Sequence, residues 1–204
     1  MGSEFDWSYL WEHHSEILLL IGFTYFLFTR VLGITPLTRN RKELLDALLS
    51  FLHQEIGKPG GLYRISESLN AEFPKNPKDP VILRKMAQEI LAHCGVQESE
   101  VTVKMGFEDL NSAGIYTGNE ISINNGLGMR KSEILAVLIH ESMHYFLIRV
   151  RGIRLEDTRE NEYLTDIAAL YMGFGAYIHR GYVKVGYLKR NEIRYVKKRL
   201  KEYS

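Results

Sequence analysis

The chain has 204 residues, a formal charge of +1 and 45% hydrophobic residues, which suits one globular domain with an extension. A charge so close to zero gives no electrostatic reason to expect nucleic acid as a partner. Cys94 is the single cysteine, so an intrachain disulfide and a thiolate-rich metal site are both excluded. Any bound metal must therefore be held by imidazole and carboxylate groups.

The N-terminal part of the chain is marked by an apolar run. Residues 1–5 resemble a cloning scar and are left out of the fold. Residues 6–34 are expected to form a hydrophobic helix, because residues 17–34 carry only one charge, Arg30. That length is close to the roughly 20 apolar residues that cross a bilayer, and basic residues follow it. The run predicts a membrane anchor that leaves the next domain in the cytoplasm; the alternative is a helix packed on a soluble cytoplasmic domain.

Residues 35–41, which contain Pro36, are expected to be a linker, and residues 42–204 a single domain. Alternating apolar residues predict a strand over 101–105 and a hairpin over 115–124. Apolar residues at helical spacing predict helices over residues 42–56, 65–73, 81–94, 132–150, 161–177 and 188–203. This mixture of elements indicates an α+β domain.

A His-Glu-x-x-His sequence lies within the helix predicted over 132–150. His140 and His144 are four residues apart, so both rings project from one face, as two nitrogen ligands of one zinc ion require. Glu141 is turned about 100° from His140, where it can act as general base on a water molecule rather than as a ligand. Apolar residues precede the motif, and buried polar groups need partners, so a metal is favoured over two ordinary core histidines.

A catalytic zinc site needs a third protein ligand, and Glu162 in the next helix can supply it. The chain between His144 and Glu162 is long enough to turn back and lay the second helix against the first. Asp166 is four residues further along the same face, so it can accept a hydrogen bond from a ligand histidine and fix its tautomer. The alternative is a solvated acidic face, but the helix around these residues is largely apolar.

At this point the chain resembles the gluzincin metallopeptidases, through residues 140–144 followed by residues 162–166. The domain looks closest to minigluzincin-like proteins, and the stretch 161–166 is similar to that of HtpX-type membrane proteases. The resemblance covers residues 101–187 and implies a zincin-like fold. In that fold a small, mostly antiparallel sheet packs on an active-site helix and a glutamate helix, with additional N- and C-terminal helices.

The resemblance further implies a zinc-dependent hydrolase that cleaves a peptide or protein substrate. Its substrate strand would lie within 115–124 and include Ile115, Tyr116, Ile121 and Ile123. Gluzincins usually carry a side chain that stabilises the oxyanion, and spacing alone leaves several candidates open. They are His179 and Tyr187, followed by Tyr177 and Tyr182. The alternative function is a non-catalytic or latent zinc-binding regulatory or interaction domain tethered to a membrane.

Overall fold

The computed structural model describes residues 37–106, 112–124, 126–181 and 186–203. The chain divides into an N-terminal unit, residues 1–38, and a larger unit, residues 39–204, which carries the elements discussed below. The predicted scar at residues 1–5 and the predicted hydrophobic helix at residues 6–34 lie outside the described residues.

The prediction of a transmembrane helix is wrong for the described part of the chain, where no helix combines the length and the apolarity needed to cross a bilayer. Helix α2, Arg39–Ile56, has the length, but only one side of it is apolar and buried. Residues 17–34, on which the prediction was based, lie outside the described residues. The described part of the chain thus contains no helix that could serve as the predicted membrane anchor.

The larger unit mixes helices with one small sheet, which confirms the predicted α+β class. After α2 the elements are α3 (Glu67–Glu72), α4 (Pro80–His93), β1 (Thr102–Met105), β2 (Gly114–Thr117), β3 (Glu120–Ile123), α5 (Lys131–His144), the π-helix η2 (Tyr145–Val150), α6 (Thr158–Tyr171), α7 (Gly175–Gly181), α8 (Arg190–Arg199) and the 3-10 helix η3 (Leu200–Glu202).

The described sheet has three strands in the order β1-β3-β2. Strands β2 and β3 form the predicted hairpin, and Gly118 in its turn has a φ of +63°, which suits glycine. Strand β1 pairs with β3 in parallel, so the sheet is mixed rather than mostly antiparallel. The difference arises because the chain passes from β1 to the far edge of the sheet and only then returns to the centre as β3.

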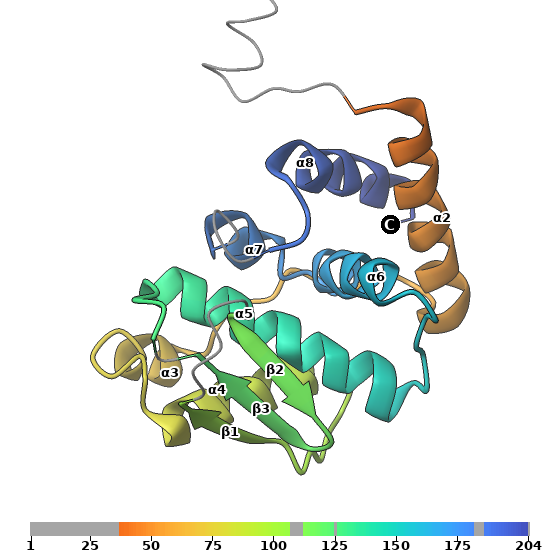
Figure 1. Ribbon diagram of the computed structural model, residues 1–204. Helices are drawn as coiled ribbons and strands as arrows, with labels where there is room; N and C mark the ends of the chain where they lie inside the picture. The colour runs from red at the N-terminus through yellow and green to blue at the C-terminus, as the bar shows by residue number, and fades with distance from the viewer. Residues whose placement is uncertain (1–36, 107–111, 125, 182–185, 204) are drawn as a thin grey trace, which may run out of the picture. The chain divides into compact units, whose positions relative to one another are not determined.

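Helix α5 is the central element of the larger unit (Figure 1). The sheet and α4 pack on one side of it, α6 and α7 pack on the other, and α2 and α8 lie beyond α6. Residues 133–144 are buried without exception. A helix covered on all sides must be apolar nearly all round, which explains the apolar run that precedes the histidines.

Two predicted helices are interrupted. The helix predicted over 132–150 changes from α to π geometry after His144. The helix predicted over 161–177 ends at Tyr171, and α7 begins at Gly175 after a turn at Gly173, whose φ of +90° is readily adopted only by glycine. The backbone of Gly61 approaches Gly173 so closely that no side chain fits between them.

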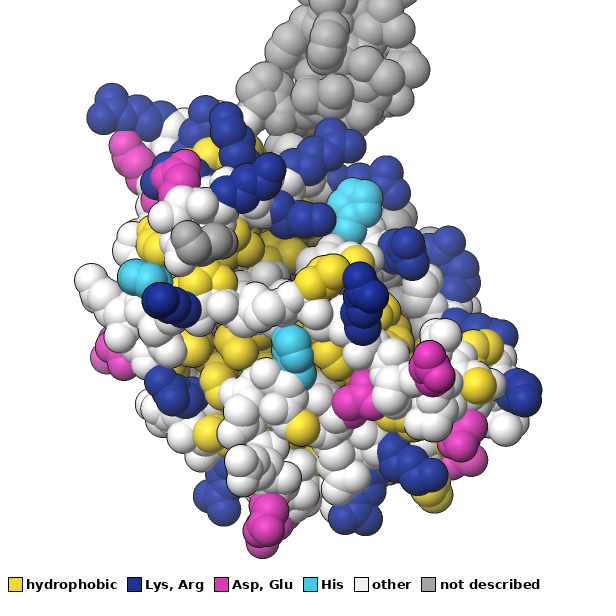
Figure 2. Space-filling model, turned by 180° about the vertical axis from the view of Figure 1, so that it is seen from behind, with side chains coloured by type: hydrophobic (Ala, Val, Ile, Leu, Met, Phe, Trp, Pro, Cys, Tyr) yellow, Lys and Arg dark blue, Asp and Glu magenta, His cyan; other side chains and the backbone are white. Residues whose placement is uncertain are grey.

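The surface of the larger unit is mixed in charge. The exposed residues of α8 are basic, among them Arg190, Arg194, Lys197 and Lys198. On the face turned away in Figure 1, lysine and arginine side chains are spread widely, with acidic side chains among them (Figure 2).

The turn at Gly173 gives a prediction about stability. Gly173→Ala adds a Cβ that overlaps the Gly61 carbonyl oxygen and also strains the backbone, so it should lower the free energy of unfolding by more than about 2 kcal/mol. Gly152→Ala is the matched control, because Gly152 also has positive φ (+68°) but has open space around it. Its cost should be only the roughly 1–2 kcal/mol of backbone strain. Denaturant unfolding measures both, and equal losses would contradict the described packing.

Candidate metal centre

The site is formed where α5 crosses α6. Helix α5 places His140 and His144 on the side that faces α6, and both are at least 90% buried. Helix α6 places Glu162 and Asp166 opposite them, and Asp166 is fully buried. The structure thus brings together the four residues that the sequence predicted for the metal and its support.

Three donor atoms converge at the crossing. His140 Nε2 lies 2.9 Å from Glu162 Oε2, His144 Nε2 lies 3.2 Å from the same oxygen, and the two Nε2 atoms are 3.1 Å apart. Two ligands at about 2.05 Å from a tetrahedral zinc ion are about 3.3 Å apart. The three residues are therefore a candidate metal-binding group, with donor atoms near the spacing that coordination requires.

Asp166 fixes the tautomer of His140. Its Oδ1 lies 2.8 Å from His140 Nδ1. Its Oδ2 accepts hydrogen bonds from the backbone amides of Tyr187 at 2.9 Å and Leu188 at 2.8 Å. A carboxylate can only accept hydrogen bonds, so in the pair with Asp166 the donor is Nδ1 of His140. The proton on Nδ1 leaves Nε2 of the neutral ring with its lone pair towards Glu162.

Thr165 does the same for His144, a role that sequence reasoning missed. The Thr165 hydroxyl donates to the Asn161 carbonyl at 2.8 Å, and it lies 3.2 Å from His144 Nδ1. Because its single proton is already used, the hydroxyl accepts from Nδ1–H of His144. The available signal was position: Thr165 is three residues after Glu162 and so shares its helix face.

The electrostatics of the site follow from these bonds. Two imidazole lone pairs and a carboxylate face one another in a buried space, so the space must hold a cation, either a proton or a metal ion. Burial opposes a charged imidazole, but hydrogen bonds to Asp166 and then Glu162 outweigh it and raise the pKa of His140 to about 10. Burial would raise the pKa of Glu162, but its bonds to the two histidines lower it to about 2.

Glu141 lies beside the donor group rather than in it. Its side chain lines the same cleft and approaches β2 so closely that a Cβ on Gly114 would lie 2.7 Å from Glu141 Oε1 and 2.6 Å from Val137 Cγ1. Burial is the main cause that raises the pKa of this carboxyl group. Glycine at the start of β2 is therefore needed for α5 to bring Glu141 against the strand, a requirement that the sequence pattern did not reveal.

A cleft of about 1340 Å³ lies over the donor group, and β2 forms one of its walls. Ile115 and Tyr116 of the predicted substrate strand line this cleft. The Tyr116 ring is nearly parallel to the His144 ring, and the two ring centroids are 6.5 Å apart. Ile121 and Ile123 lie instead in β3, which is paired on both sides, and both are fully buried. They have no free edge and no access to the cleft, so only the first half of the hairpin fits the prediction.

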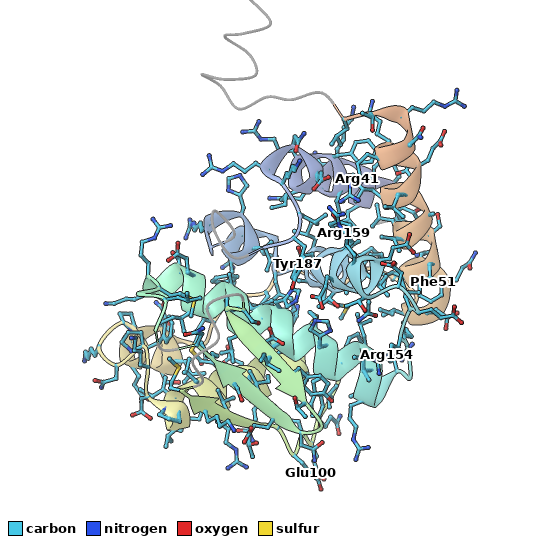
Figure 3. The ribbon with its side chains drawn as sticks, in the orientation of Figure 1. Arg41, Phe51, Glu100, Arg154, Arg159 and Tyr187 are labelled. Carbon is cyan, nitrogen blue, oxygen red and sulfur yellow. The ribbon has the colours of Figure 1, made fainter. Side chains whose placement is uncertain are left out.

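The residues predicted to stabilise the oxyanion differ in whether they line the cleft. Tyr187, which is labelled in Figure 3, lines the cleft. Its ring lies over His140 with a centroid distance of 5.6 Å and an interplanar angle of 22°. His179 is exposed on α7 and is not part of the cleft wall. Tyr177 accepts a hydrogen bond from the Ile65 amide at 3.3 Å, and Tyr182 lies outside the described residues. Of the two first candidates, Tyr187 lines the cleft and His179 does not, and the oxyanion role stays a prediction.

Comparison of the chain with protein-family models, with curated proteins and with solved structures gives no match. The gluzincin resemblance therefore stays a prediction.

The donor geometry predicts specific losses of metal affinity. His140→Ala and His144→Ala each remove a ligand and should abolish tight zinc binding in titration calorimetry. Asp166→Asn leaves the ligands but removes the carboxylate that holds His140, so affinity should fall about 10- to 100-fold. His179→Ala, an exposed histidine away from the cleft, is the control and should bind as the wild type does. Tight zinc binding by His140→Ala would contradict the assignment of His140 as a metal ligand.

Proposed function

We propose that the chain is a zinc-dependent metallopeptidase that hydrolyses peptide bonds, with His140, His144 and Glu162 as metal ligands and Glu141 as general base. The observation that supports this most is the position of Glu141. It is buried in the cleft wall between the donor group and the edge strand, where a substrate carbonyl can lie next to both. The proposal includes the zincin-like arrangement that the sequence motifs suggest.

Zinc is the metal that this donor set favours. Two imidazoles and one carboxylate are a common catalytic zinc set, and three protein ligands leave a fourth position open. When bound, zinc would supply a water of lowered pKa and would polarise a carbonyl oxygen. Asp166 and Thr165 contribute by keeping both Nδ1 protons in place, so that both Nε2 atoms stay available.

Glu141 would take the proton of the attacking water and pass it to the leaving amine. A general base works best when its pKa approaches the working pH, and burial shifts Glu141 in that direction. Because the Glu141 side chain is packed against Gly114 of β2, its carboxylate is held in position before substrate arrives.

Strand β2 is an edge strand of the described sheet, and its outer edge is suited to an extended peptide. The amide of Asn124 in β3 donates to the Ala113 carbonyl at 2.9 Å, and hydrogen-bonded pairs alternate along an antiparallel ladder. The backbone groups of Gly114 and Tyr116 therefore point away from β3, towards the cleft. The Gly114 carbonyl accepts a bond from Ser112 Oγ at 2.5 Å. Its amide and both groups of Tyr116 are then available for a substrate strand.

Tyr187 is the candidate for stabilising the oxyanion. Burial first, and then the negative charges of Glu162 and Glu141, raise its pKa to about 12. The phenol therefore keeps its proton at neutral pH and can donate a hydrogen bond to a developing negative charge. Its backbone amide is bonded to Asp166, so the residue is tied to the support of His140.

The first test of the function is Glu141→Gln. This variant should keep zinc and lose about 10²- to 10⁴-fold in kcat/KM on any peptide that the wild type cleaves, because only the proton acceptor has been removed. A peptide library followed by mass spectrometry measures cleavage, with Glu98→Gln, an exposed site, as control. Zinc binding without turnover in the wild type would favour the alternative of a non-catalytic zinc domain. Equal activity in Glu141→Gln would remove its role as base.

The second test is Tyr187→Phe, which removes only the phenolic hydroxyl. If the hydroxyl stabilises the transition state, kcat should fall about 10- to 10³-fold while KM changes little. Tyr177→Phe, outside the cleft, is the matched control for loss of a phenol. A change in KM alone would show that Tyr187 only helps to bind the substrate.

A further inference from the structure

The change from α to π geometry after His144 has a consequence for the cleft. On an α-helix, a residue five positions after His144 would be turned about 140° away from it. A π-helix turns less per residue, because its hydrogen bonds join residues five apart, as in the 3.0 Å bond from the Arg151 amide to the Phe146 carbonyl. Arg149 is thereby brought back towards the His144 side, and it lines the cleft together with Ile148.

Arg154, in the segment between η2 and α6, lines the same cleft. It lies towards the end of η2, whereas Tyr187 lies beside α7 (Figure 3). Both Arg149 and Arg154 are exposed, and neither makes a hydrogen bond or an ion pair with any residue that the structure describes. By contrast, Arg41 and Arg199 are tied to Glu192 and Asp46.

The guanidinium of Arg149 is close enough to influence Tyr116. Burial and Tyr145 raise the pKa of Tyr116, and the positive charge of Arg149 opposes them. The described acidic residues of the cleft wall are already engaged: Glu133 with Arg130, Glu162 with the two histidines, and Glu141 as the proposed base. The cleft thus presents two cations, Arg149 near Tyr116 and Arg154 towards the end of η2, and no described carboxylate of its wall is paired with either.

We propose that Arg149 and Arg154 form a specificity subsite for an acidic side chain of the peptide substrate. The inference rests on the proposed peptidase function and adds the substrate class. Guanidinium groups recognise carboxylates through charge and paired hydrogen bonds. Tyr116 is two residues from Gly114, about 7 Å along an extended strand. The acidic residue should therefore lie two to three positions from the scissile bond, on the Tyr116 side only.

The test compares peptides that carry Glu or Gln at single positions around the scissile bond. All are acetylated and amidated, so that the side chain is the sole source of a carboxylate. We expect kcat/KM for the Glu peptide to exceed that for the Gln peptide at least about threefold on one side, and the ratio to fall as salt is raised. In Arg149→Gln/Arg154→Gln the ratio should approach one, whereas Arg84→Gln, an exposed arginine on α4, should keep it.

Two further measurements test the subsite formed by Arg149 and Arg154. Arg149→Glu should reverse the preference, so that a Lys peptide is cleaved better than its Gln counterpart. Equilibrium binding of the same peptides to zinc-loaded Glu141→Gln, followed by fluorescence anisotropy, should give the same Glu-over-Gln ratio without turnover. If no peptide is cleaved but this binding ratio holds, the peptidase function fails and the acidic subsite stands. A ratio of one in the wild type, or a ratio unchanged in the double variant, would overturn the subsite.

Discussion

The structure of the site depends on two imidazole rings whose Nε2 atoms are both directed at one carboxylate oxygen in a largely buried space. Asp166 and Thr165 impose this by accepting the Nδ1 protons of His140 and His144. Three electron-rich atoms within about 3 Å of one another repel unless a cation lies between them. A proton on His140 can satisfy them in the free protein, and a divalent ion satisfies all three at once.

The rest of the fold serves that constraint. The sheet, α4, α6 and α7 cover helix α5 and bury residues 133–144, and its histidines and Glu141 line the cleft. The Tyr187 and Leu188 amides reach Asp166 because the chain turns back after α7. Glycine at positions 114 and 173 allows two close backbone approaches that larger residues would prevent. The packing of the unit thus also supports the candidate metal ligands.

The sequence predicted the parts of the site that are set by helical periodicity. A four-residue spacing places His140 with His144, and Glu162 with Asp166, on common faces whatever the tertiary structure. The α+β class and most element positions also followed from local patterns. Contacts between distant segments did not follow: the parallel pairing of β1 with β3, and the choice of Tyr187 over His179, depend on how the chain returns.

Other features were missed because their signals are weak in sequence. A π-helix differs from an α-helix by a small change in turn, so the spacing of apolar residues in 145–150 still suggested one continuous helix. Thr165 resembles any buried threonine until His144 is placed beside it. Ile121 and Ile123 were expected in a substrate strand but lie in the central strand of the described sheet, because alternation predicts a strand and not whether it is central or at the edge.

X-ray absorption at the zinc edge, on protein loaded with one equivalent of zinc, can identify the atoms that bind the metal. We expect two imidazole nitrogens at about 2.0–2.1 Å from the zinc ion and a carboxylate oxygen at about 2.0–2.2 Å from it. In Glu162→Ala the signal of the carboxylate oxygen should disappear from the spectrum, and the signals of both imidazoles should remain. A zinc ion that does not bind, or that binds with fewer than two imidazoles, would contradict this expectation.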